Sequence, residues 1–383
     1  MKLSTRANLL KGQEMFKILA QVNELERKGK HIIHLELGDP DFDTPLLIRQ
    51  SAKVAIDSGV THYAPSQGRW ELLNAAQEVT ERSRGFKPEL NQLLVTAGAN
   101  VAIYYALACI CDPGDEVIVS DPCFVSYISI MKWLGIKIVT VPLTMENKFK
   151  LRAEDVESKI TKRTRAIIVN SPNNPCGSVL DATDTFELFS TAVNYNLMLI
   201  SDEIYARMTY EQNFSSCAWD KCKSNVVVIN GFSKSYAMTG WRLGVTTGPK
   251  KLINKMSLLL ETTSSCVNPF VQLAGVTALL GNQDDTFKMI KEYKERRNLL
   301  VDGLNEIKGI DCLQPQGAFY VFPDIHWTGL TSTQFVSKAL AAGVALVPGN
   351  VFGKNGEGFV RLCYANSKEN IIIALERLKK VKP

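Results

Sequence analysis

Residues Asn230–Gly244 read NGFSKSYAMTGWRLG and follow a short apolar run, Val226–Ile229, that is typical of a buried strand. Lys234 therefore lies at the end of a buried strand, among small residues, where its ammonium group is costly to desolvate. Such surroundings lower the pKa of a lysine and free its amine to attack carbonyl groups. Arg242, further along the stretch, offers a rigid cation suited to a phosphate. The pair predicts a site for a carbonyl compound that carries a phosphate, although a Ser-Lys dipeptide alone would indicate only a solvated turn.

Length and composition predict a globular protein of two domains. The 383 residues exceed one ordinary domain, and a content of 45% hydrophobic and 22% charged residues provides an ample core. The net charge of +5 is too small and too scattered to indicate nucleic acid as a partner. It suits anionic small molecules instead.

Nothing in the sequence indicates a membrane, an export signal or a metal. The longest apolar run, Val101–Cys111, is shorter than the roughly 18 residues that cross a bilayer, and the first residues contain no apolar export segment. The nine cysteines form no Cys-x-x-Cys pair, which fits a reducing compartment. His31 and His34 have no cysteine or carboxylate cluster beside them. We therefore expect a soluble cytoplasmic protein without a metal site.

From about residue 92 onward, strand-like runs alternate with helical patterns. This alternation predicts an α/β fold, with a mostly parallel seven-stranded sheet wrapped by helices. In such folds ligands bind at the carboxyl ends of the strands, and each motif described below follows a strand. The seven runs are Leu93–Val95, Glu116–Ser120, Ile136–Val141, Arg165–Asn170, Leu197–Ser201, Val226–Ile229 and Leu243–Thr246.

A long charged helix, from about Asp284 to Ile307, is interpreted as the bridge to a smaller α+β domain. We expect a large domain over 45–282 and a small domain made of 1–44 and 283–383. The small domain should contain strands near Ala318–Phe322, Ala345–Val347 and Gly358–Cys363, and helices at Thr331–Ala342 and Ser367–Val381.

Three turns after predicted strands carry polar or aromatic groups. Gly98-Ala99-Asn100 opens a helix, and helix N-termini bind anions, although many such turns contain glycine. Phe124 follows another strand and could stack on a ring. Asn174 lies in a turn that is rich in proline and asparagine, where a rigid turn is the simpler explanation. Its amide could also donate a hydrogen bond to a ligand.

Two charged residues are predicted to be buried. Asp202 ends the strand Leu197–Ser201 and needs a cationic partner, unless it caps a following helix. Arg361 lies within the apolar run Gly358–Cys363 and requires a bidentate anion, which could be a ligand or a structural carboxylate.

Two irregular segments precede helices in the N-terminal part. The first, from Gly38 to Pro45, ends in Thr44 and Pro45, which are good N-cap and first-turn residues. The second contains Tyr63 and ends at Gly68.

Taken in order from about residue 30 to 380, these motifs resemble the class I aminotransferases, the fold-type-I enzymes that use pyridoxal 5′-phosphate (PLP). The resemblance is strongest to the aromatic and broad-range branch, through NGFSK…AMTGWRLG and the GAFY segment at Gly317–Tyr320. It implies that Lys234 bonds covalently to PLP and then acts as general base. It also implies that Asp202 pairs with the pyridine nitrogen and that Phe124 stacks on the ring.

The resemblance assigns the remaining site residues as well. Asn174 and Tyr205 would donate to the phenolic oxygen of PLP, and Arg361 would hold the substrate carboxylate, with Gly38 in a loop over the substrate. Tyr63 would reach the phosphate of the partner subunit's cofactor, which implies a homodimer. Gly231 departs from members that have a phosphate-binding serine there. The phosphate would be bound by Gly98, Ala99, Asn100, Ser233 and Arg242.

The implied activity is transamination between an L-amino acid and a 2-oxo acid such as 2-oxoglutarate. Bacterial aspartate-preferring members carry a lysine where this chain has Asn100, so we expect aromatic or large apolar substrates. An aspartate-preferring enzyme stays possible if Arg6 folds over the site. A β-eliminating carbon–sulfur lyase is the alternative within the same fold. A PLP-binding regulator is the alternative outside enzymes, and the intact Lys234 argues against it.

Overall fold

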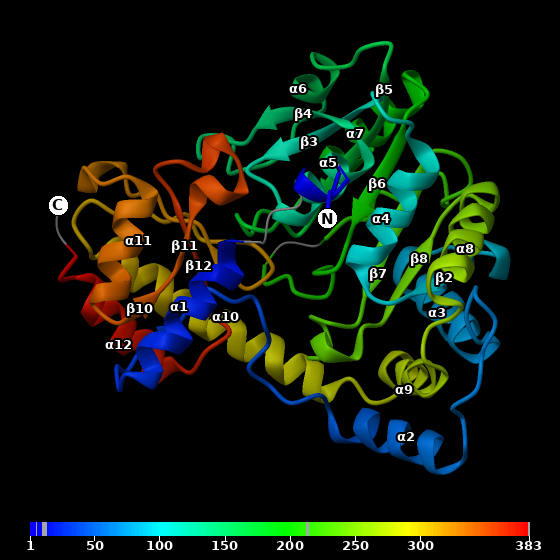
Figure 1. Ribbon diagram of the computed structural model, residues 1–383, viewed down its shortest axis with the longest axis horizontal. Coiled ribbons are helices and arrows are strands. Elements are labelled where there is room, and N and C mark those ends of the chain that lie inside the picture. The colour runs from blue at the N-terminus through cyan, green and yellow to red at the C-terminus, as the bar shows by residue number, and fades with distance from the viewer. Residues whose placement is uncertain (5, 10–13, 212–213, 382–383) are drawn as a thin grey trace.

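The computed structural model describes residues 1–4, 6–9, 14–211 and 214–381 (Figure 1). Its central feature is a seven-stranded sheet in the order β2-β8-β7-β6-β5-β3-β4. Strand β8 runs antiparallel to both of its neighbours, and all other pairs are parallel. The strands are β2 (Leu93–Thr96), β3 (Glu116–Asp121), β4 (Lys137–Pro142), β5 (Thr164–Asn170), β6 (Met198–Asp202), β7 (Val226–Gly231) and β8 (Gly244–Thr247). The predicted fold class is confirmed.

Helices cover both faces of this sheet, which explains why its inner strands are apolar throughout. One face packs against α4 (Ala99–Ile110), α5 (Val125–Leu134) and α8 (Lys250–Ser264). On the opposite face, one group of helices packs near β5 and β6, and another packs near β2 and β8. The first group is α6 (Ala153–Glu157) and α7 (Ala182–Asn194); the second is α2 (Leu46–Asp57), α3 (Trp70–Arg84) and α9 (Pro269–Leu280).

The long helix α10 (Asp284–Asn305) leads from α9 into a second group of elements, on the left of Figure 1. Here β9 (Tyr320–Val321), β12 (Val360–Cys363) and β11 (Val347–Pro348) form an antiparallel sheet with a core of its own. The helices of this group are α1 (Glu14–Arg27), α11 (Ser332–Ala341) and α12 (Lys368–Leu378). The domain boundaries at 45 and 283 stay a prediction.

The N-terminal part of the chain returns to this second group. Strand β1 (Ile33–His34) pairs in parallel with β10 (Val344–Ala345). The single strand expected at 345–347 is therefore wrong, because the chain divides there into β10 and β11, which pair in different sheets. Each is only two residues long, so an apolar run could not reveal the break.

Thr44 does not cap α2. The helix begins at Leu46 after Pro45, without a side-chain cap. The Thr44 hydroxyl instead donates to the Ala237 carbonyl at 2.6 Å and accepts from Trp241 Nε1 at 3.0 Å. The loop before α2 is thereby fastened to the segment that contains Lys234.

Candidate active site

A cavity of about 180 Å³ lies at the carboxyl ends of the parallel strands. It is formed where β5, β6 and β7 end, beside the N-terminus of α4, as expected for an α/β sheet. The predicted residues that line it are Ala99, Asn100, Phe124, Asn174, Asp202, Tyr205, Ser233, Lys234 and Arg242. A larger hollow of about 810 Å³ adjoins it and shares Thr239 and Arg242.

Lys234 presents its amine inside this cavity. Burial lowers the pKa of the amine to about 8, because desolvation disfavours the charged form. Its Nζ donates to the carbonyl of Gly38 at 2.6 Å and lies 5.6 Å from the centre of the Phe319 ring. The predicted loop glycine therefore touches the predicted reactive lysine. A substantial share of neutral amine near pH 8 is what nucleophilic attack requires.

Asp202 ends β6 and is 4% exposed. Burial raises the pKa of its carboxyl group to about 6. The carboxylate accepts from the hydroxyl of Tyr127 at 2.5 Å and from the backbone N–H of Ile204 at 3.2 Å. Within the described residues it has no cationic partner, and the residues that follow form turns rather than a helix. The capping alternative is therefore wrong, and the buried carboxylate lacks a cation.

Gly98 packs against Arg242, which lines the cavity. Helix α4 begins at Ala99, and Gly98 has a φ of +91°. A side chain at position 98 would collide with Arg242 Nη2, so glycine is required for the close approach. Arg242 donates to the Thr239 carbonyl at 2.8 Å and forms no ion pair with any described carboxylate. A cation beside a helix N-terminus suits an anion.

Arg361 is 1% exposed and lies between the rings of Tyr320 and Phe352, with its guanidinium carbon 4.5 and 4.9 Å from the ring centres. It donates to Asn174 Oδ1 at 3.0 Å and to the carbonyl of Glu36 at 2.6 Å, and its Nε has no partner in the described chain. Both recorded acceptors are neutral. The structural ion pair that the sequence left open is not formed with any described carboxylate.

Asn174 and Tyr205 line the cavity together with Asp202 and Lys234. Because Asn174 Oδ1 accepts from Arg361, its amide nitrogen is left to donate elsewhere. The Tyr205 hydroxyl lies 2.9 Å from that of Tyr320. Phe124 packs edge-on against Tyr127 at 5.5 Å between ring centres.

Four predicted site residues do not line the cavity: Gly38, Tyr63, Gly98 and Arg361. Gly38, Gly98 and Arg361 each contact a residue that does, namely Lys234, Arg242 and Asn174. The side chain of Tyr63 is instead 89% exposed. At Gly231, which departs from serine-bearing relatives, a side chain would collide with Ile204 Cδ1. The glycine therefore leaves space for Ile204, which itself lines the cavity.

Three residues of the site were not singled out in the sequence. Tyr127 lies three positions after Phe124, one helical turn further on α5, so its position was a usable signal. Tyr320 belongs to the quoted GAFY segment, but that segment does not reveal the contacts with Tyr205 and Arg361. The Glu36 contribution is a backbone carbonyl, which no side-chain pattern could reveal.

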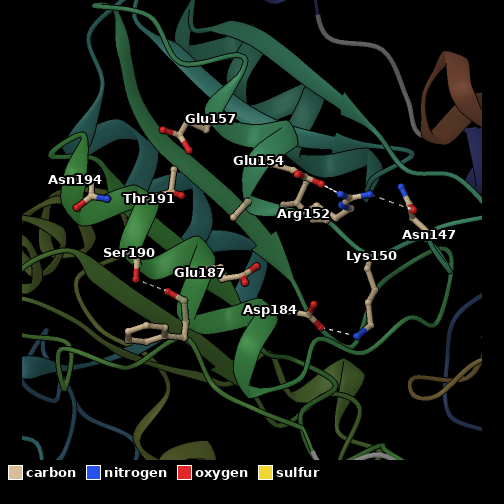
Figure 2. A pocket seen from close by; sticks show the side chains of 13 residues that line it. Asn147, Lys150, Arg152, Glu154, Glu157, Asp184, Glu187, Ser190, Thr191 and Asn194 are labelled. Atoms are coloured by element: carbon tan, nitrogen blue, oxygen red, sulfur yellow. Dashed lines mark hydrogen bonds and ion pairs between the residues drawn. The ribbon is translucent and has the colours of Figure 1, made fainter.

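A different hollow, of about 700 Å³, lies between α6 and α7 and contains none of these residues (Figure 2). Its two basic side chains are both paired with lining carboxylates, Lys150 with Asp184 and Arg152 with Glu154, whereas Glu157 and Glu187 pair with no described cation. Because neither cation is free to bind an anionic cofactor or substrate, this hollow is a poor candidate for the chemistry that the sequence predicts. No group of three or more potential metal ligands occurs among the described residues.

The charges of the site fit PLP. Asp202 lacks a cation that a protonated pyridine nitrogen would supply, and Arg242 with the N-terminus of α4 lacks an anion that a phosphate would supply. Lys234 provides an amine for an aldehyde. Arg361 remains for a carboxylate.

Known proteins agree with this geometry. Residues 30–378 match the family described as aminotransferase class I and II. Aspartate aminotransferase of Pyrococcus horikoshii is 39% identical over 99% of this chain and 96% of its own length. Aromatic-amino-acid aminotransferase 2 of Thermococcus litoralis is 38% identical over 100% of this chain and 98% of its own length. The structure of Thermus thermophilus aspartate aminotransferase with maleate has a TM-score of 0.96 at 36% identity and covers 99% of both chains. The chain belongs to the class I and II aminotransferase family and is an aminotransferase that uses pyridoxal 5′-phosphate.

Proposed function

We propose that the protein transfers the amino group of an L-amino acid with an aromatic or large apolar side chain to a 2-oxo acid such as 2-oxoglutarate. The observation that supports this substrate preference most strongly is the set of charges around the cavity. Among the described residues, Lys234 and Arg242 are the cations that line the cavity or the hollow beside it, and Asn100 is neutral. Asp39 and Asp43 line the hollow instead, and their charges would repel a side-chain carboxylate.

The relatives leave the preference open, because one is named for aspartate and another for aromatic amino acids. Arg6 is exposed, so an approach of this residue to the substrate is the competing explanation. The β-eliminating lyase is not favoured, because the similar proteins cited above are all named aminotransferases.

Bound PLP supplies an electron-withdrawing ring that stabilises negative charge at the substrate α-carbon. Asp202 would keep the ring nitrogen protonated by offering a buried carboxylate, which Tyr127 holds in place. Phe124 would stack on the ring, and Asn174 and Tyr205 would donate to its phenolic oxygen. The amine of Lys234 would hold the aldehyde carbon.

The phosphate would be bound by the backbone at Gly98, Ala99 and Asn100, by the Ser233 hydroxyl and by Arg242. All of these except Gly98 line the cavity, and Gly98 packs against Arg242.

The substrate is oriented by its α-carboxylate. Arg361 would bind it through guanidinium N–H groups that have no partner now, Nε among them, helped by Asn174, while Gly38 borders the site from the loop. Lys234, once free, takes the proton from the α-carbon, because its low pKa gives a neutral amine near pH 8. The rings of Tyr320 and Phe352 exclude water from the arginine.

The active unit is proposed to be a homodimer in which Tyr63 donates to the phosphate bound by the partner subunit. Its exposed side chain and the resemblance to the family support this. We expect Tyr63→Phe to weaken PLP binding by about 1.5–3 kcal/mol, the strength of one charge-assisted hydrogen bond, without unfolding the chain. Titration with PLP measures the change. A fully active monomer in sedimentation under assay conditions would contradict the proposal.

The two-domain division at 45 and 283 is also part of the proposal. Its support is that most of one core cluster comes from α10, α11, α12 and the strands between them. A cytoplasmic location fits nine cysteines that form no disulfide. None of the described helices is long and apolar enough to cross a membrane.

The experiment is a comparison of kcat/KM for phenylalanine and aspartate with one common acceptor, together with a pyruvate assay for elimination. We expect phenylalanine to be preferred. A preference for aspartate of more than tenfold, about 1.4 kcal/mol in transition-state binding, would contradict the proposal. The Arg6→Ala variant is the control, because it should leave the ratio unchanged unless Arg6 reaches the substrate.

A further inference from the structure

A second cavity, of about 550 Å³, lies behind the segment that contains Lys234. Phe232, Ser235 and Tyr236 line it, whereas Ser233 and Lys234 line the active-site cavity. The two cavities have no lining residue in common. They are therefore separate spaces on opposite sides of one segment of chain.

The second cavity exists because helices cover this face of the sheet incompletely. The helices α2, α3 and α9 pack near β2 and β8, and α6 and α7 pack near β5 and β6. Between these groups the face presents Asn230 of β7 and Val245 and Thr247 of β8 to the cavity. Asn230 pairs with Val245 in the sheet, so both side chains point to the same face. The sides are formed by the C-terminal half of α3 and by Ala206, Arg207, Thr209, Phe214 and Ser216.

The walls are largely apolar. Val79 of α3, Val245 and Leu279 provide aliphatic surface, and Phe232 and Tyr236 provide rings. The hydroxyls of Ser235 and Thr247 have no recorded hydrogen bond, and the buried Tyr236 hydroxyl has no partner within the described residues. Polar groups are thus left unused around an apolar space, as in pockets that bind small molecules.

The charged lining residues are two arginines, and they differ in their partners. Arg84 is paired with the buried carboxylate of Glu203 at 2.5 Å. Arg207 donates to the neutral Gln283 at 2.9 Å and lies over the Tyr236 ring at 5.3 Å. Within the described part of the chain, no acidic residue lines the cavity and no carboxylate pairs with Arg207. The cavity therefore contains one uncompensated positive charge.

We propose that this cavity is a second binding site, for a small aromatic or apolar carboxylate whose anionic group pairs with Arg207. Its volume lies within the range of roughly 300–1,000 Å³ that is usual for small-molecule sites. A phosphate dianion fits less well, because the lining residues Thr80, Ser83 and Arg84 belong to the C-terminal part of α3. The carbonyl groups there repel concentrated negative charge. A ligand here contacts the residues on both sides of Lys234 without entering the catalytic cavity.

The test is calorimetric titration of the PLP-loaded protein with naphthalene-2-carboxylate, which has no amino or oxo group to react. We expect saturable binding that Arg207→Gln weakens at least about tenfold, the loss of one ion pair in an apolar pocket. Val79→Trp should abolish binding, because the larger side chain fills the space. Inhibition of transamination by the same compound should be noncompetitive toward the amino acid.

Both variants should keep the melting temperature and transamination rate of the parent protein, which shows that they fold. The control is Arg152→Gln, which removes an arginine from the surface hollow of Figure 2 and should not change binding. If Arg152→Gln weakened binding as much as Arg207→Gln does, the proposal would be overturned. It would also be overturned if binding competed with the amino acid and was unchanged in the Arg207→Gln and Val79→Trp variants. Absence of saturation up to about 10 mM, a binding energy below roughly 3 kcal/mol, would overturn it as well.

Discussion

Asp202 and Glu203 are neighbours, both are almost fully buried, and their surroundings are opposite. Glu203 is paired with Arg84 at 2.5 Å and accepts from Ser201, Ser216 and the backbone of Cys217. Asp202 accepts one hydroxyl and one backbone N–H and has no cation among the described residues. One carboxylate is satisfied by the chain, and the other is left for a ligand.

Two buried arginines repeat the contrast. Arg297 and Arg361 are each 1% exposed. Arg297 donates to both oxygens of Glu211 at 2.6 Å, whereas the recorded bonds of Arg361 go to neutral oxygens. Since isolated buried charges are costly, Asp202 in the cavity and Arg361 beside it, which have no counter-charge among the described residues, indicate a site built for charged ligands.

The largest expected effect concerns Lys234. Replacing it with alanine removes both the covalent attachment of PLP and the general base, so transamination should fall at least about 10³-fold. Borohydride reduction of the parent protein, followed by peptide mapping, should locate PLP on Lys234. The exposed Lys251 is the matched control, and its alanine variant should stay yellow and active. A Lys234→Ala protein that still forms a reducible bond with PLP would show that the assignment is wrong.

Arg361→Gln should lower kcat/KM by about 10²–10³-fold, because two charge-assisted hydrogen bonds to the substrate carboxylate are lost at roughly 1.5–3 kcal/mol each. Its stability should change little, because no described carboxylate is left unpaired. Steady-state kinetics and urea unfolding measure the two effects. If Arg361→Gln lost stability as well as activity, Arg361 would have a structural role like that of Arg297, and the contrast between the two arginines would be wrong.

Arg297→Gln should show the reverse and smaller pattern. The loss of its bonds to Glu211 should lower the free energy of unfolding by about 1–3 kcal/mol, while kcat/KM stays near that of the parent. The same two assays apply. If Arg297→Gln loses activity but keeps its stability, a buried arginine that is paired with a carboxylate can also be a site residue. The contrast between Arg297 and Arg361 would then be wrong.

The sequence was most informative where a simple pattern carries the physics. Apolar runs such as Val226–Ile229 predicted the strands of the large sheet within a few residues, because strands buried on both faces are continuously apolar. The same rule brought Lys234, Asp202 and Asn174 together, since the carboxyl ends of parallel strands meet at one edge.

Other features depend on contacts between distant segments, and no local pattern encodes them. The Thr44 hydroxyl forms hydrogen bonds with Ala237 and Trp241 rather than capping α2, because the loop before α2 packs against the segment that contains these two residues. The contribution of Glu36 to Arg361 is a backbone carbonyl 325 positions away. The division of 344–348 into two strands follows from pairing with β1 and β12 in different sheets.

Asp202 offers the most direct test, through its pH dependence. In the folded protein the pKa of its carboxyl is about 6, above the ordinary value of 3.8. The unfolded chain therefore loses this proton first, so stability falls as the pH rises from about 4 to 6 and the penalty persists above that interval. Asparagine carries no charge and avoids the penalty.

The deciding measurement is urea unfolding of the PLP-free parent, Asp202→Asn and Glu203→Gln proteins between pH 4 and 7. At pH 7, Asp202→Asn should be more stable than the parent by about 1–3 kcal/mol, a gain that vanishes near pH 4 and reverses when PLP is bound. Glu203→Gln should be less stable by about 3–5 kcal/mol, because Arg84 is left unpaired. A PLP-free Asp202→Asn protein that is destabilised at pH 7, as Glu203→Gln is, would contradict the claim that this carboxylate is reserved for the cofactor.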